Sequence, residues 1–172
     1  FEAAGDAAEA VRWHERAAIW LEGRDPKAGR HHWERLLELI GAEPESPELT
    51  RAALRSCTRL IALGVMLGLE FARGEALYRR GRTLAARLDD PNLEAGLIGA
   101  FARLANFSGA YASALEAAQE VLVLMPRVSE PRELGEVCFA AANQLAIDGR
   151  TSDALAVIDA VLAGGKVNES TP

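Results

Sequence analysis

Three histidines are the side chains of this sequence best suited to acid–base or metal chemistry. His31 and His32 are adjacent on a predicted helix, so their side chains point about 100° apart and cannot face one ligand together. His14 lies on the preceding predicted helix, from which it can approach His32 across the first hairpin. Such a pair could bind a metal or exchange protons, but we favour a structural role. We therefore expect no metal site and no cofactor.

Clustered carboxylates and indoles are the next candidates for chemistry. The carboxylates lie in a proline-containing loop ahead of a predicted helix, at Glu43, Glu45 and Glu48. Paired acids can transfer protons, but acids in this position also stabilise the positive end of a helix, which is the role we favour. The indoles are Trp13, Trp20 and Trp33. They could form an aromatic cage, but their spacing favours the core of the first hairpin.

The sequence contains no recognisable catalytic motif. It has no phosphate-binding loop, no G-x-G-x-x-G after a strand, no H-E-x-x-H and no G-x-S-x-G. Cys57 and Cys138 are far apart on apolar helix faces, which favours two buried, reduced thiols over a disulfide, a metal site or a nucleophile. We expect no catalytic residue and no enzymatic activity.

Charge is distributed unevenly along the chain. Residues 51–88 carry eight arginines against two glutamates, a net charge of +6, whereas residues 1–50 carry −5 and residues 89–172 carry −7. Arg51, Arg55 and Arg59 follow one another at four-residue spacing and form one ridge on a predicted helix. A basic groove would suit an acidic peptide, a phosphorylated segment or a nucleotide phosphate.

The alternatives for this ridge are a solvated face paired with nearby acids, or docking of a neighbouring domain. Nucleic acid is an unlikely partner, because the chain as a whole is acidic and lacks stacking aromatics beside the arginines.

The elements that position these residues are predicted to be helices. Alanine is abundant and period-two alternation is absent, so we expect an all-α fold. Asp25-Pro26, Ser46-Pro47 and Asp90-Pro91 are start signals, Ser129 is the expected cap of the seventh helix, and Gly164-Gly165 should end the eighth. The four predicted antiparallel pairs cover residues 6–41, 47–88, 91–125 and 130–163 of a domain spanning 1–165, followed by a disordered tail over 166–172.

Each predicted helix has one apolar face, which stacked pairs could share. The first helix should bury Ala10, Trp13, Ala17, Trp20 and Leu21. The last helix should bury Ala154, Leu155, Ile158, Val161 and Leu162.

An internal repeat supports this stacking. The segment Gly109–Leu115 recurs as Gly149–Leu155, so that Ala114 and Ala154 lie 40 residues apart. Periods of this size are typical of stacked helical hairpins, a solenoid. The segment Leu93–Pro126 resembles the tetratricopeptide repeat, with the small residue Ala102, the turn Gly109, the aromatic Tyr111, the packing Ala114 and the terminal Pro126. The resemblance implies a right-handed superhelix.

A second resemblance concerns context. The segments Ala8–Ala18, His32–Leu37 and Glu75–Ala85 are similar to the helical region behind the ATPase module of large bacterial signalling proteins, the class III adenylate cyclases and large LuxR-type regulators. In those proteins the repeats are thought to sense a partner or ligand. The nucleotide-binding loop and the cyclase aspartates are not in this sequence, so neither activity can be assigned to a residue here.

We therefore expect a non-catalytic interaction and sensor module that binds a protein or peptide segment, or neighbouring domains, in its concave groove. The expected binding residues are Arg51, Arg55, Arg59, Asn92, Arg103 and Asn106. A small-molecule receptor with a pocket between the helices is the alternative, and a spacer or homodimerisation surface is a third. Because no apolar run approaches 18 residues and no leader is evident, we expect a cytoplasmic protein without a membrane partner.

Overall fold

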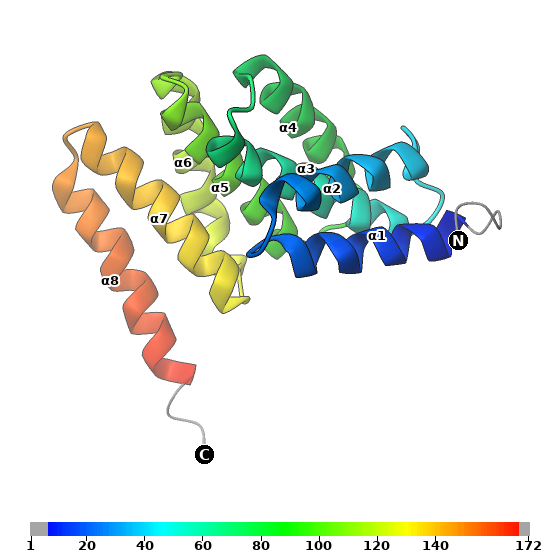
Figure 1. Cartoon of the computed structure of the whole chain (residues 1–172). Coiled ribbons are helices and arrows are strands. Elements are labelled where there is room, and N and C mark those ends of the chain that lie inside the picture. Colours follow the sequence, from blue (N-terminus) through cyan, green and yellow to red (C-terminus); the bar gives the residue numbers. More distant parts are fainter. Residues whose placement is uncertain (1–6, 169–172) are drawn as a thin grey trace. The chain divides into compact units, whose positions relative to one another are not determined.

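The computed structural model describes the backbone of residues 7–168 and, within them, all side chains except those of residues 7, 131–134, 136, 160 and 163–168. The described part is helical and contains no strand, which confirms the all-α prediction (Figure 1). Its elements are α1 (Ala7–Leu21), α2 (Pro26–Ile40), α3 (Pro47–Leu67), α4 (Phe71–Ala85), α5 (Pro91–Phe107), α6 (Tyr111–Leu124), the 3-10 helix η2 (Met125–Arg127), α7 (Pro131–Ile147) and α8 (Thr151–Asn168).

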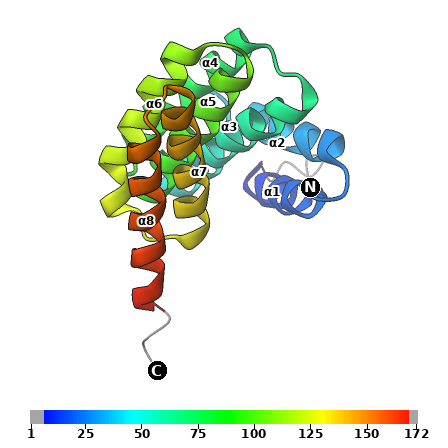
Figure 2. The same cartoon turned by 90° about the vertical axis from the view of Figure 1, so that its left-hand side faces the viewer.

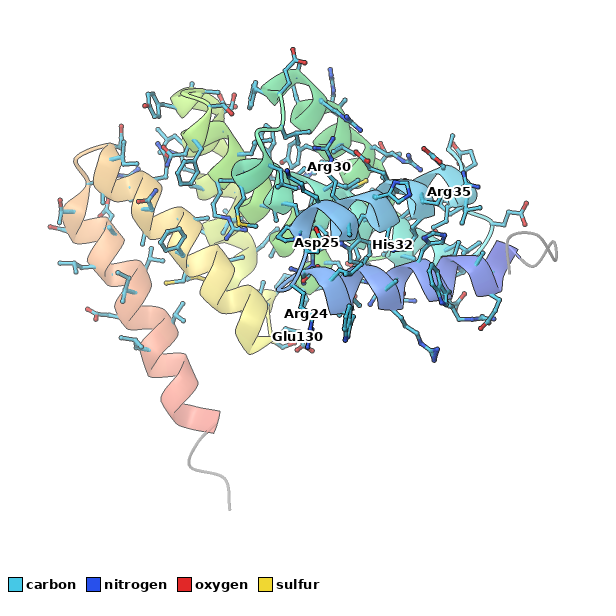
Figure 3. The ribbon with its side chains drawn as sticks, viewed as in Figure 1. Arg24, Asp25, Arg30, His32, Arg35 and Glu130 are labelled. Atoms are coloured by element: carbon cyan, nitrogen blue, oxygen red, sulfur yellow. The ribbon has the colours of Figure 1, made fainter. Side chains whose placement is uncertain are left out.

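Three helices begin where the sequence predicts, at an Asp or Ser followed by proline. The Asp25 carboxylate accepts a hydrogen bond from the Ala28 N–H at 3.0 Å, and Figure 3 shows Asp25 at the start of α2. Ser46 caps α3 and Asp90 caps α5 in the same way. These side chains satisfy N–H groups that have no partner within their own helix, and proline at the first position sacrifices no hydrogen bond.

The turns that join α5 to α6 and α7 to α8 are equivalent. Gly109 and Gly149 both have a φ of 78°, a conformation that favours glycine. The residue after each glycine donates its N–H to a carbonyl five residues earlier, at 2.8 Å and 2.9 Å. Both first helices begin with a proline and contain 17 residues. The two segments that share the sequence repeat therefore form turns of the same geometry.

Packing divides the chain into two compact units, one ending at Asp89 and one beginning at Asp90. In the first unit α1 packs on α2, α2 on α3, and α3 on α4. In the second unit α5 packs on α6 and α7 on α8, and α7 contacts both α5 and α6. The two helices of each pair run in opposite directions (Figures 1 and 2).

Helix α1 turns a different face toward its neighbours from the one predicted. His14 and Ala18 are buried, whereas Trp13 is 47% and Trp20 60% exposed. Both faces have helical spacing, and the buried one carries small residues such as Ala18, which let α1 and α2 approach closely. The placement of Trp13 and Trp20 in the hairpin core is therefore wrong, while Trp33 is buried as predicted.

Two boundaries also differ from the prediction. Helix α7 begins at Pro131 with Glu130, not Ser129, at the capping position. Helix α8 continues through Gly164-Gly165 to Asn168, because glycine inside a helix costs only about 1 kcal/mol and ends it only where the backbone turns left-handed. The predicted disordered tail is therefore wrong for residues 166–168, and residues 169–172 lie outside the described part.

The end of α3 depends on a glycine for space. Gly68 takes a left-handed conformation, and the N–H of Leu69 donates to the Gly64 carbonyl at 2.8 Å. This arrangement folds the Leu69 side chain back onto the last turn of α3, directly over Gly64.

Replacing Gly64 with alanine should therefore destabilise the chain. The added Cβ would lie 2.5 Å from the Leu69 Cβ, so that backbone must shift, at a cost of about 1–3 kcal/mol. Chemical denaturation followed by circular dichroism measures the change in unfolding free energy.

Gly135→Ala in α7 is the matched control for this substitution. A Cβ at Gly135 meets no atom within 4 Å, and helix propensity favours alanine there by about 1 kcal/mol. A Gly64→Ala protein as stable as the unmodified chain would contradict the packing at the end of α3.

Candidate functional site

The predicted arginine ridge lies beside α1, and two of its three members form ion pairs there. Arg55 Nε is 3.1 Å from Glu15 Oε1, and Arg59 Nε is 3.4 Å from Glu22 Oε1. The third, Arg51, helps to lower the pKa of Glu48, after the larger effects of hydrogen bonds from the backbone and from Ser46. Two arginines of the ridge on α3 are thus already paired with glutamates of the first hairpin.

The other arginines of the basic segment also reach toward the acidic first hairpin. Arg73 is 2.8 Å from Glu34, whose carboxylate Arg30 also contacts at 3.0 Å. Near the end of α2, Arg87 pairs with Glu43 at 3.4 Å. Arg80 donates a hydrogen bond to the carbonyl of Gly41.

The charge asymmetry of the sequence therefore has an internal explanation. Residues 51–88 carry +6 and residues 1–50 carry −5, and ion pairs within the first unit join side chains of these two segments.

The expected binding residues of α5 are partly buried, and Asn92 is engaged within the second unit. Its Oδ1 accepts hydrogen bonds from the N–H groups of Ser129 and Glu130, at 2.9 Å and 3.0 Å. Asn92 thus holds the segment that leads into α7, but it does not cap that helix, because both donors precede Pro131. Arg103 and Asn106 are half-buried. These three residues belong to the second unit, whereas the arginine ridge belongs to the first.

The histidine pair forms as the sequence predicts. His14 Nδ1 and His32 Nδ1 are 2.8 Å apart, a hydrogen-bond distance, with the Trp13 ring edge-on to both imidazoles. His32 lies on α2, as Figure 3 shows, and His31 contacts it at a ring separation of 6.0 Å. Burial, reinforced by the neighbouring histidines, lowers the pKa of His32. Among the described residues, no group of three or more His, Cys, Asp or Glu could hold a metal ion.

Neither thiol is disposed for nucleophilic chemistry. Cys57 is free and buried in α3, and burial raises its pKa to about 11, so it is protonated at neutral pH. Cys138 is free as well, but it is only half-buried, contrary to the prediction. Desolvation also raises the pKa of Cys138.

A feature that the sequence reasoning missed is an apolar groove between α7 and α8. Its volume is about 510 Å3, and its polar lining residues are Asn143 and Thr151. Three large apolar side chains in its walls are exposed: Phe139 by 58%, Leu155 by 56% and Leu162 by 59%. The predicted burial of Leu155, Ile158 and Leu162 is therefore wrong. Their helical spacing was recognised, but spacing alone does not reveal whether another element covers the face.

A solved structure shares this fold. The crystal structure of BtubC (BKLC) from P. vanneervenii is similar over 97% of this chain and 68% of BtubC, with a TM-score of 0.74 and 16% sequence identity. No family model matches the sequence, and neither does any curated protein. At this identity the likeness concerns the fold alone.

Across residues 7–168, none of the helices combines the length and the apolar content required to cross a membrane.

Removing the shared carboxylate of Glu34 should weaken the first unit. Glu34→Gln leaves Arg30 and Arg73 without their common partner, so we expect a loss of about 0.5–1 kcal/mol in unfolding free energy at low salt. Urea denaturation at low and at about 0.5 M salt measures this loss, which screening should reduce.

Glu38→Gln is the matched control for that loss, because Glu38 is more exposed and pairs with Arg35 one turn away in the same helix. Equal effects of the two substitutions at both salt concentrations would contradict a bridging role for Glu34.

The histidine pair should make stability depend on pH. Because the pKa of His32 is lowered on folding from 6.5, the folded chain binds fewer protons than the unfolded chain. Stability is then fully present above pH 6.5 and is lost as the pH falls. Urea denaturation at about pH 7.5 and 5.5 should show a smaller pH effect in His32→Gln than in the unmodified chain. An identical pH effect in both proteins would contradict this assignment.

Proposed function

We propose that this chain is a non-catalytic interaction module whose hairpins stack as a right-handed superhelix of tetratricopeptide-like pairs. The four pairs would span residues 6–41, 47–88, 91–125 and 130–163. The repeated turns at Gly109 and Gly149 support this arrangement, as does the fold likeness to BtubC. In such arrays each repeat contacts its neighbours, and the extended surfaces of the array bind partners.

The observation that carries the proposal is the apolar groove of α7 and α8. Soluble proteins rarely leave contiguous apolar surface exposed unless it binds something. Here Phe139, Leu155 and Leu162 are each more than half exposed along one groove. The amide of Asn143 and the hydroxyl of Thr151 can form hydrogen bonds with a partner, but neither is a general acid or base at neutral pH. The groove is thus suited to binding and not to catalysis.

The arginine ridge is a weaker candidate for the partner's location. An acidic segment bound there would have to compete with Glu15 and Glu22 for Arg55 and Arg59. Exchanging one carboxylate for another gains little free energy, because the ion pair lost resembles the ion pair formed. We therefore assign the principal contact to the α7–α8 groove.

The proposed context is a larger cytoplasmic signalling protein of the adenylate cyclase or LuxR-type regulator class. The resemblance of Ala8–Ala18, His32–Leu37 and Glu75–Ala85 to the helical regions of such proteins supports this context. In it, the groove would transmit the presence of a partner, or hold a neighbouring domain of the same protein.

A small-molecule receptor is the second candidate, and the size of the groove favours it. A volume of about 510 Å3 lies within the range of roughly 300–1,000 Å3 that is usual for ligand pockets. A bound metabolite would raise the melting temperature in proportion to its saturation. Thermal-shift screening against metabolites therefore distinguishes this candidate from a protein-binding groove.

The proposed function predicts a position-specific crosslinking pattern in the native cell. A photo-crosslinking amino acid in place of Leu155 should capture a partner protein, because this side chain lines the groove. The same amino acid in place of Glu116, an exposed residue of α6 outside the groove, is the control and should capture none. Capture of a partner by the crosslinker in place of Arg55, but not in place of Leu155, would contradict the assignment. It would indicate that the partner binds at the arginine ridge.

A further inference from the structure

The exposed face of the α7–α8 hairpin can be compared with the equivalent face of the α5–α6 hairpin. The two hairpins have equal first helices and equivalent glycine turns, so each residue of α5 or α6 corresponds to the residue 40 positions later. Helix α7 packs on both α5 and α6. The α5–α6 face therefore shows how one hairpin of this chain is covered by a helix that lies across both of its members.

Equivalent positions differ in burial between the two faces. Gly99 and Ala118 are buried, whereas their counterparts Phe139 and Ile158 are exposed. Leu115 is half-buried, and its counterpart Leu155 is 56% exposed. The α7–α8 face thus repeats a helix-binding surface, with its apolar side chains in place and uncovered.

At two positions the exposed side chain is also larger than its covered counterpart. Terminal repeats that end an array usually present a polar outer face to water. Here Phe139 stands where the preceding hairpin has Gly99, and Ile158 where it has Ala118. At these two positions the α7–α8 face presents larger apolar side chains than the covered face, whereas a solvent-facing end would present polar ones.

The charge around the groove indicates what kind of helix fits. The second unit, residues 90–172, has eleven acidic and five basic residues, a net charge of −6. Asp148 and Asp159 are exposed at the turn before α8 and next to Ile158, whereas Asp153 is 2.7 Å from Arg150. A second copy of this chain would bring like charges together, but a helix with basic flanks would find counter-charges.

We propose that the α7–α8 groove binds an amphipathic helix with an apolar face and basic flanks, lying across both helices as α7 lies across α5 and α6. The inference rests on the proposed function and specifies the partner of the same groove. Apolar side chains of the ligand would fill the space between Phe139, Leu155 and Leu162. Lysine or arginine on its flanks would lie near Asp148 and Asp159.

The test uses two dye-labelled peptides and fluorescence anisotropy with the whole chain. Both peptides carry on one face four apolar residues that are buried in α7, namely Val137, Ala140, Ala141 and Leu145. One has lysines and the other glutamates on both flanks. We expect the lysine peptide to bind at least about tenfold more tightly at low salt, and the difference to shrink at high salt.

Variants of the chain locate the binding site. The double substitution Leu155→Gln and Leu162→Gln changes exposed side chains, so the fold should persist, and binding of the lysine peptide should fall at least about tenfold. Val123→Gln is the matched control, because Val123 is an exposed apolar residue of α6 outside the groove, and it should leave binding unchanged.

Three results would overturn the inference. They are equal binding of the two peptides, insensitivity to the double substitution, and a concentration-dependent dimer in light scattering that the double substitution abolishes. The last result would identify a second copy as the occupant. If the crosslinker at Leu155 captures a partner in cells while the lysine peptide does not bind, the helix inference fails and the proposed function stands. If the crosslinker captures no partner and the lysine peptide does not bind, the helix inference and the proposed function both fail.

Discussion

The fold depends on one constraint: an amphipathic helix must bury its apolar face, and a single hairpin cannot bury all of it. In the second unit α7 meets this requirement for α5 and α6 by packing across both. Ala114, Ala118 and Val121 are buried in consequence. Burial of apolar area contributes about 25 cal/mol per Å2, so the packing of α7 on α5 and α6 stabilises that hairpin. The face of α7 and α8 is a place in the described residues where apolar side chains remain exposed.

Electrostatics complements burial in the first unit. The acidic α1–α2 segment and the basic α3–α4 segment form pairs such as Glu15–Arg55 and Glu34–Arg73. Each exposed pair contributes little, about 1 kcal/mol or less. Together they join the two hairpins through opposite charges. The charge imbalance in the sequence is thus largely a property of the packing within this unit.

Local features of the fold could be predicted from sequence because their causes are local. Asp25-Pro26 marks a helix start through a bond between residues three apart, and Gly109 marks a turn through its own φ. The approach of His14 to His32 followed from helix phase across a short turn. The capping position of α7 was missed by one residue, because Glu130 and not Ser129 precedes the first helical residue, Pro131.

The α7–α8 groove could not be predicted from the sequence, because a groove remains only where no other helix packs on the apolar face. The spacing of Leu155 and Leu162 is that of a buried helix, and only the packing of neighbouring helices reveals that they are exposed. On α1 the sequence analysis predicted that Trp13 is buried, but the structure buries the adjacent His14 instead. The spacing of apolar residues did not show which of the two faces packs on α2. Sequence patterns give the faces of a helix, but not which face a distant element approaches.

Hydroxyl-radical footprinting of the free chain tests the central claim most directly, since it reports side-chain exposure in solution. The account predicts that Phe139, Leu155 and Leu162 are oxidised about as readily as their residue types allow in water, comparably to the exposed Val123. Protection of these three residues to the level of the buried Leu97 and Ile98 would contradict the account, because the groove would then already be filled.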